Sequence, residues 1–138
     1  MNLATLRVEG IDSDLEALKK TLSLESDVHW SKGERRRNGS VHISSGFNAT
    51  VADAKNPKEL IGLIRAFLAL CKNKQIVFPR MNLEAELAVG FTVGDSEQFV
   101  ASVELSPSEL LSCAECGITL SVTAYPTSDE ANAEENAT

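Results

Sequence analysis

The sequence lacks several features that mark common classes of protein. It contains no apolar run long enough to span a bilayer, because the longest one, residues 60–71, is interrupted by Arg65. Its first residues have no basic start followed by a continuous apolar core, so we expect no secretory signal. These two absences predict a cytoplasmic protein that makes no contact with a membrane.

Cysteine and histidine are too few and too scattered to indicate a metal site. The three cysteines include the motif Cys113-x-x-Cys116, but no second pair accompanies it, and His29 and His42 lie far back in the chain. This pair falls at the end of an expected helix, whereas a redox pair sits at a helix start, where the dipole lowers a thiol pKa. We therefore expect buried structural cysteines, a reducing compartment, and no metal or other cofactor.

Motifs for phosphate binding and hydrolysis are absent as well. The sequence has neither glycine-rich phosphate-binding pattern, and it has no H-E-x-x-H and no G-x-S-x-G. Neither histidine stands in a context that marks a catalytic nucleophile. The sequence therefore indicates no catalytic residue, and a non-catalytic protein is favoured over an enzyme.

Basic residues are also fewer than acidic ones, 13 against 20. The formal net charge is −7, and residues 126–138 hold four acidic residues and no basic one, which leaves about −3 for the rest of the chain. Nonspecific binding to nucleic acid needs a net basic face, so it is disfavoured here. An acidic protein suits solubility, or docking to a basic partner.

Three segments carry signals that are typical of helix starts. Each has a capping residue followed three positions later by a glutamate, and two of them have proline at the first helical position: Ser13 with Glu16, Asn56 with Glu59, and Ser106 with Glu109. Apolar residues then recur at helical spacing. This spacing predicts helices over about 13–22, 57–72 and 107–115.

Alternation of apolar and polar residues indicates strands elsewhere. The clearest run covers residues 83–93, and a turn leads from it into a second run at 98–105, which predicts a hairpin. Shorter or less regular alternation predicts four further strands, at 4–10, 27–30, 40–45 and 118–125. In the strand at 40–45, this alternation predicts that Val41 and Ile43 face inward and that His42 lies on the polar side.

The expected element order is β-α-β-β-α-β-β-α-β. It predicts one α+β domain over residues 1–125, with an antiparallel-rich sheet that carries three helices on one face. The first six elements match the ferredoxin-like order. Residues 126–138 have no large apolar side chain, so we expect them to form a disordered acidic tail.

Two surfaces are candidates for binding a partner. The first is the connection between the strands at 27–30 and 40–45. Its tryptophan and arginines are residue types common in binding hot spots, although the charges could also simply keep a hairpin soluble. Its candidate residues are Trp30, Lys32, Glu34, Arg35, Arg36 and Arg37. The polar side of the expected hairpin at 83–105 supplies an acidic surface: Glu84, Glu86 and Glu104.

Two other interpretations of the basic connection stay open. Trp30 would form the wall of a pocket for an anionic metabolite, held by Lys32 or Arg35, if the protein binds a small ligand or is an enzyme. Single-stranded nucleic acid would stack on Trp30 and contact the arginines, but the acidic balance of the chain makes this the weakest hypothesis.

The run VHWSKGERRRNGSVHISS, residues 28–45, resembles the signature of a bacterial family of small domains of unknown function. In that signature a Trp-x-Lys-Gly-acid, here residues 30–34, leads into a basic hairpin and then a strand that ends in Ser44 and Ser45. The segment LSPSELLSCAECGITLSVTAY, residues 105–125, is similar to the family's close. The chain departs from the pattern at Ser40 and Val41, where the family carries a tryptophan.

The resemblance covers residues from about 4 to 125. Genes for domains of this family often lie beside toxin genes, and the domains have no agreed catalytic role. The resemblance therefore implies an immunity or antitoxin protein, which binds and neutralises a bacterial toxin, and the acidic chain suits a basic toxin. It leaves the oligomeric state open.

Overall fold

The computed structural model describes residues 1–97 and 100–136, which form an α+β domain. The strands are β1 (Asn2–Gly10), β2 (Val28–Trp30), β3 (Ser45–Asp53), β4 (Glu84–Val93) and β5 (Ile118–Pro126). The helices are α1 (Asp12–Leu22), α2 (Pro57–Asn73), α3 (Pro107–Cys116) and α4 (Asp129–Asn136), with a 3₁₀ turn η1 (Phe78–Met81).

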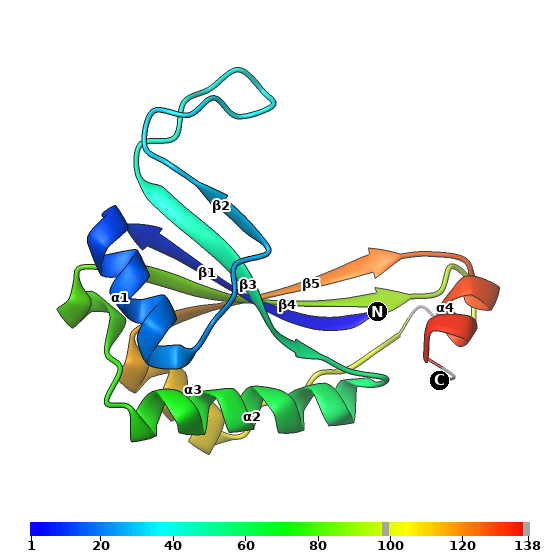
Figure 1. Ribbon diagram of the computed structural model, residues 1–138. Coiled ribbons are helices and arrows are strands. Elements are labelled where there is room, and N and C mark those ends of the chain that lie inside the picture. Colours follow the sequence, from blue (N-terminus) through cyan, green and yellow to red (C-terminus); the bar gives the residue numbers. More distant parts are fainter. Residues whose placement is uncertain (98–99, 137–138) are drawn as a thin grey trace.

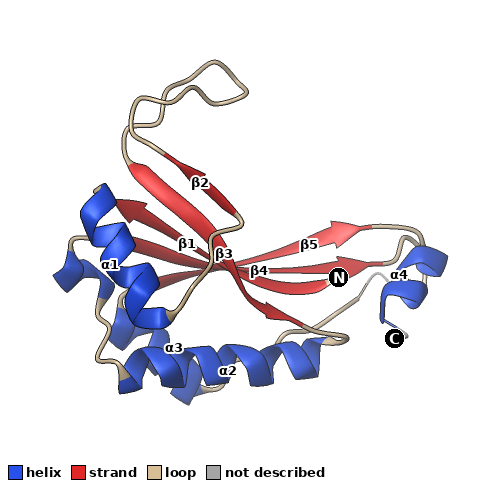
Figure 2. Ribbon diagram, in the orientation of Figure 1, coloured by secondary structure: helices blue, strands red, loops and turns tan. Residues whose placement is uncertain are grey.

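One mixed sheet organises the domain, with strand order β2-β3-β1-β4-β5. The pairs among β2, β3, β1 and β4 are antiparallel, and β5 runs parallel to β4. Helices α1, α2 and α3 lie on one side of this sheet, and the connection between β2 and β3 rises on the other side (Figure 1). Figure 2 shows that no helix of the described residues covers that second side, which we call the uncovered face.

Alternation along the central strands separates the core from the uncovered face. On β1, Leu6 and Val8 are fully buried against the helices, while Arg7 and Glu9, which alternate with them, point to the uncovered face. On the helix layer, α2 packs a stripe of buried apolar residues into the same core: Leu60, Ile61, Ile64, Phe67, Leu68 and Cys71. The main hydrophobic core therefore lies on the helix side.

The expected helix starts differ in how they are capped. The Asn56 side chain accepts a hydrogen bond from the Glu59 backbone N–H at 2.8 Å, which confirms the cap of α2. Ser106 occupies the N-cap position of α3, but its side chain makes no capping hydrogen bond. The expected cap at Ser13 is wrong, because α1 begins at Asp12 with Ile11 as its N-cap, and Ser13 lies within the helix.

Glu109 of α3 illustrates how α2 and α3 are joined. Its side chain is 3% exposed, and its Oε1 accepts hydrogen bonds from Arg65 Nε and Nη2 at 3.0 and 2.7 Å. These hydrogen bonds lower the pKa of the Glu109 carboxyl below its ordinary value. The ionised form of the Glu109 side chain is therefore more favourable in the folded chain than in the unfolded one.

A pH dependence of stability follows from the lowered pKa of Glu109. Its contribution is fully present above the pKa of an unfolded glutamate, and it is lost as the pH falls through the lower pKa of the folded state. Glu109→Gln should remove this contribution, which urea unfolding over a series of acidic pH values would measure. Glu25→Gln, at an exposed glutamate on another part of the chain, is the control. If the parent and Glu109→Gln lost the same free energy of unfolding as the pH falls, the Arg65–Glu109 pair would make no pH-dependent contribution to stability.

Two expected strands are placed differently in the structure. The hairpin partner at 98–105 is wrong: residues 100–105 form no strand, and residues 98 and 99 lie outside the described part of the chain. The neighbour of β4 is instead β5, brought alongside by α3. The strand at 40–45 is shifted, because the regular strand β3 begins at Ser45.

The chain also forms a fourth helix where the sequence predicts a disordered tail. Ser128 Oγ accepts a hydrogen bond from the Ala131 N–H, and α4 is tied back to the turn after β4, where Asp129 accepts from the Ser96 hydroxyl at 2.6 Å. At its other end Glu135 accepts from Thr92 and from the Met1 ammonium group. Residues 137 and 138 lie outside the described part.

Candidate functional site

Trp30 anchors the base of the connection between β2 and β3. Its ring lies on the uncovered face over Gly46, with the guanidinium of Arg7 4.8 Å from the ring centroid. The imidazole of His42 stacks on it at 5.2 Å between centroids and 20° between planes. Trp30 is thus only 7% exposed, and its main contacts are within the protein.

This packing bears on the pocket interpretation. A pocket wall needs an accessible ring, whereas the Trp30 ring is covered by His42, Arg7 and the backbone of β3. Its indole N–H is buried and has no hydrogen-bond partner among the described residues, so ring packing holds it in place. The residues around Trp30 therefore support an architectural role for it.

Residues 31–44, which we call the arm, form a hairpin that projects from the sheet (Figure 1). Two backbone hydrogen bonds of 2.9 Å join its sides, from the Gly33 N–H to the His42 carbonyl and from the His42 N–H to the Glu34 carbonyl. At the tip, the Arg36 N–H donates to the Ser40 carbonyl at 2.7 Å, and Gly39 supplies a positive φ of 86°. The expectation of a hairpin connection is confirmed.

The arm carries apolar residues where the sequence predicts inward-facing ones. Val41 is 50% exposed and Ile43 is 86% exposed. His42 between them turns toward Trp30, and because side chains alternate along an extended chain, its two neighbours must point outward. The polar members of the predicted site on the arm are all exposed as well: Lys32, Glu34, Arg35, Arg36 and Arg37.

The expected acidic surface is partly rearranged. Glu84 and Glu86 lie on the uncovered face, as the alternation of β4 predicts, but Glu104 does not extend them. Glu104 belongs to no strand and lines a hollow at the start of α2 with Asn56 and Arg65. The assignment of Glu104 to this surface is wrong, because residues 100–105 do not pair with β4.

Glu9 is the residue that sequence reasoning missed on this surface. The register of β1 and β4 places Glu9 opposite Glu84, and Arg7 opposite Glu86. We call Glu9, Glu84 and Glu86 the acidic cluster, which Arg7 only partly neutralises through its 3.1 Å contact with Glu9. The alternation of Leu6 and Val8 was a usable signal for the face on which Glu9 lies, but the sequence contains no signal for the register of β1 with β4.

The arm and the acidic cluster meet at the same end of the sheet. The arm leads from Trp30 into Ser45, and Ser45 and Gly46 pair with the last residues of β1, Glu9 and Gly10. Because Glu9 is also opposite Glu84, the cluster lies at the base of the arm. The two candidate surfaces are therefore neighbours of opposite charge.

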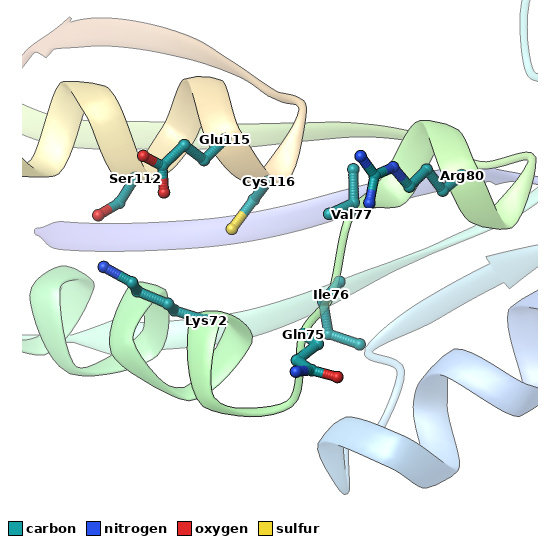
Figure 3. Close-up of a pocket in the computed structure, with 8 residues that line it drawn as sticks. All are labelled: Lys72, Gln75, Ile76, Val77, Arg80, Ser112, Glu115 and Cys116. Carbon is teal, nitrogen blue, oxygen red and sulfur yellow. The ribbon is translucent and has the colours of Figure 1, made fainter.

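A separate hollow of about 450 Å³ lies between the end of α2, η1 and α3, as Figure 3 shows. It is lined by groups of both charges and by one thiol: Lys72, Gln75, Ile76, Val77, Arg80, Ser112, Glu115 and Cys116. Nothing in this mixed, open lining selects one ligand.

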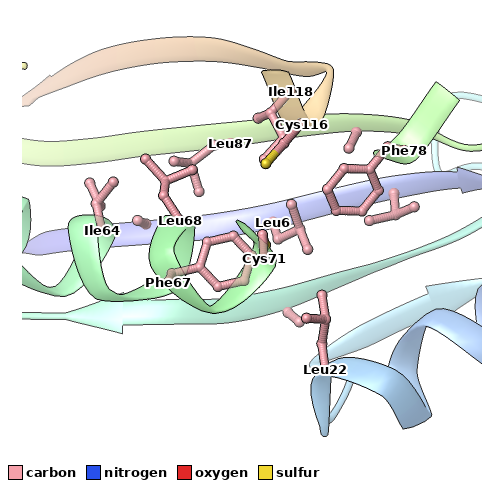
Figure 4. Close-up of a cluster of buried hydrophobic side chains, with 14 of the residues drawn as sticks. Leu6, Leu22, Ile64, Phe67, Leu68, Cys71, Phe78, Leu87, Cys116 and Ile118 are labelled. Carbon is pink, nitrogen blue, oxygen red and sulfur yellow. The ribbon is translucent and has the colours of Figure 1, made fainter. Parts of the chain in front are cut away.

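The cysteines support a structural interpretation. Cys71, Cys113 and Cys116 are free and buried, and Figure 4 shows Cys71 and Cys116 within the hydrophobic core. Burial raises the pKa of the Cys71 thiol to about 12, which disfavours the reactive thiolate. The described residues contain no group of three or more side chains placed to hold a metal ion.

Of the helices in residues 1–97 and 100–136, none combines the length and the apolar character that crossing a membrane requires. Searches against protein-family models, curated proteins and solved structures found no match to the chain.

Proposed function

We propose that the protein is a non-catalytic immunity or antitoxin protein that binds a bacterial toxin through the arm and the adjoining acidic cluster. The observation that carries this proposal is the arm itself. It exposes Val41 and Ile43 beside four cationic side chains, and it makes few contacts with the rest of the domain. Exposed apolar residues on a projecting hairpin suit insertion into a partner surface.

The construction of the arm favours binding to a folded protein. Its internal hydrogen bonds and the packing of His42 on Trp30 hold it in one shape before any partner arrives. A preformed element loses less conformational entropy on association than a flexible loop. Arginine and large apolar side chains are also the types from which binding hot spots are built.

The charge pattern describes the surface that a partner should present. The acidic cluster would face basic residues of the toxin, while Arg35, Arg36 and Arg37 would face an acidic or polar region beside them. Such complementarity accelerates encounter and selects among partners. The cytoplasm is the proposed location, and the resemblance of residues 28–45 to a toxin-associated family supports the same role.

Co-expression with the product of the neighbouring gene tests the proposal. A stable complex and rescue of growth are expected, and Val41→Lys should weaken the complex about tenfold or more, because it places a charge in the apolar contact. Val122→Lys is a matched control, since Val122 is a valine of nearly equal exposure, 49%, on β5 at the opposite edge of the sheet from β2. Absence of both complex and rescue would overturn the proposal.

The acidic cluster has its own matched pair of variants. Glu86→Lys should slow association with a basic toxin and make it less sensitive to salt, whereas Glu104→Lys should change it much less. Surface plasmon resonance at several salt concentrations would measure both. Equal effects of the two variants would show that net charge matters and that the cluster does not.

A further inference from the structure

The strand β5 forms one edge of the sheet and has an unusual composition for an edge. It pairs with β4 on one side, and its residues from Val122 to Pro126 are exposed. Residues 117–128 contain no charged side chain. Edge strands are commonly protected by charges, prolines, bulges or short length, and this nine-residue strand has only Pro126 at its end.

The hydrogen-bonding groups on the free side of β5 can be identified. The Thr127 N–H donates to the Val93 carbonyl of β4, and N–H groups alternate in direction along a strand. Leu120, Val122 and Ala124 therefore direct their N–H and carbonyl groups away from the sheet. No hydrogen bond to these outward groups is found in residues 1–97 and 100–136.

The opposite edge of the sheet is protected. There β2 pairs with only three residues of β3, and beyond it the Asp27 carboxylate accepts hydrogen bonds of 2.7 Å from the Thr50 N–H and hydroxyl. A carboxylate at that position blocks the approach of another strand. The contrast leaves β5 as the edge that is open to pairing.

We infer that β5 pairs antiparallel with β5 of a second copy, which joins two sheets into one. A two-fold axis at Val122 places Val122 opposite itself, Leu120 opposite Ala124, and Ser121 opposite Thr123. These pairs match apolar residues with apolar ones and hydroxyls with hydroxyls, as an isologous interface requires. The outward N–H and carbonyl groups of Leu120, Val122 and Ala124 would satisfy one another.

Charge and side-chain placement favour a second copy as the occupant. The chain carries a net charge of −7, so an uncharged strip such as β5 lets two copies approach without like-charge repulsion at the contact. The Tyr125 ring also leaves the edge clear, because it lies back across Gly90 of β4. A strand from another protein is the competing occupant, and the mass of the purified chain separates the two.

Light scattering on the purified full chain over a concentration series tests the inference. The parent should reach twice the chain mass, and Val122→Lys should stay monomeric, because the axis would bring two lysines together. Val41→Lys should dimerise like the parent. A parent that remains monomeric at every concentration, or a Val122→Lys variant that still dimerises, would overturn the inference.

Hydrogen exchange on the unaltered chain gives a second test that does not depend on any variant. The amides of Val122 and Ala124 should exchange slowly at high concentration and rapidly on dilution. A dimer in which these amides exchange rapidly would place the interface elsewhere. The arm is not involved, so Val122→Lys should still bind the toxin, and the two proposals can fail separately.

Discussion

Replacement of Trp30 by alanine should lower the free energy of unfolding by about 3 kcal/mol or more, as expected for loss of a buried aromatic side chain. The indole is covered by His42, Arg7 and β3, so its removal leaves a cavity that the surrounding side chains can fill only in part. Chemical denaturation monitored by circular dichroism would measure the loss. The variant should also free the arm, because its inner attachment is gone.

Trp30→Phe is the matched control for this prediction. A phenyl ring retains the stack with His42 and part of the contact with Arg7, so it should recover more than half of the lost stability. Proteolysis within residues 31–44 should be fast in the alanine variant and slow in the phenylalanine one. If Trp30→Ala abolished toxin binding without any loss of stability, Trp30 would be a contact residue and not an anchor.

The parts of the fold that the sequence predicts best are those that depend on local patterns. The Asn56 cap with Pro57 and the apolar stripe after it predict α2, and the alternation from residue 83 predicts β4. Each signal lies within a single element, where the period of the chain and the chemistry of its ends are sufficient.

The pairing of strands could not be predicted in the same way. Residues 98–105 and β5 both alternate, and only tertiary packing decides that β5 takes the place beside β4. Alternation assigns a residue to a face, while register decides its neighbours. Glu9 therefore joins Glu84 in the acidic cluster and Glu104 does not, although the sequence distance suggests the reverse.

The arm shows the same limit at the level of single side chains. The sequence marks residues 28–45 as a basic hairpin, and this is confirmed. It does not show that His42 packs on Trp30, a contact that reverses the expected directions of Val41 and Ile43. The most exposed apolar residues of the proposed binding site therefore became visible only in three dimensions.

Gly46→Ala should destabilise the protein by about 2 to 3 kcal/mol, through overpacking at the base of the arm. A Cβ atom at Gly46 would lie 2.4 Å from Cζ2 of Trp30 and 2.6 Å from the backbone carbonyl oxygen of Val8. The indole could be displaced, but the carbonyl belongs to the centre of the sheet and cannot move far. Gly62→Ala is the control, because a Cβ there meets no atom within 4 Å, and alanine should stabilise that helix.

A double-mutant cycle would separate the two contacts of Gly46. In a Trp30→Ala background the clash with the indole is absent, so Gly46→Ala should cost less there than in the parent, by about 1 kcal/mol or more. The clash with the Val8 carbonyl remains in both backgrounds, so the cost should not fall to zero. Additive effects would mean that Trp30 does not rest on Gly46, and the arm would then need another anchor. Coupling of the expected sign would instead establish that a glycine of β3 allows the tryptophan of β2 to lie flat on the sheet, where it fixes the arm.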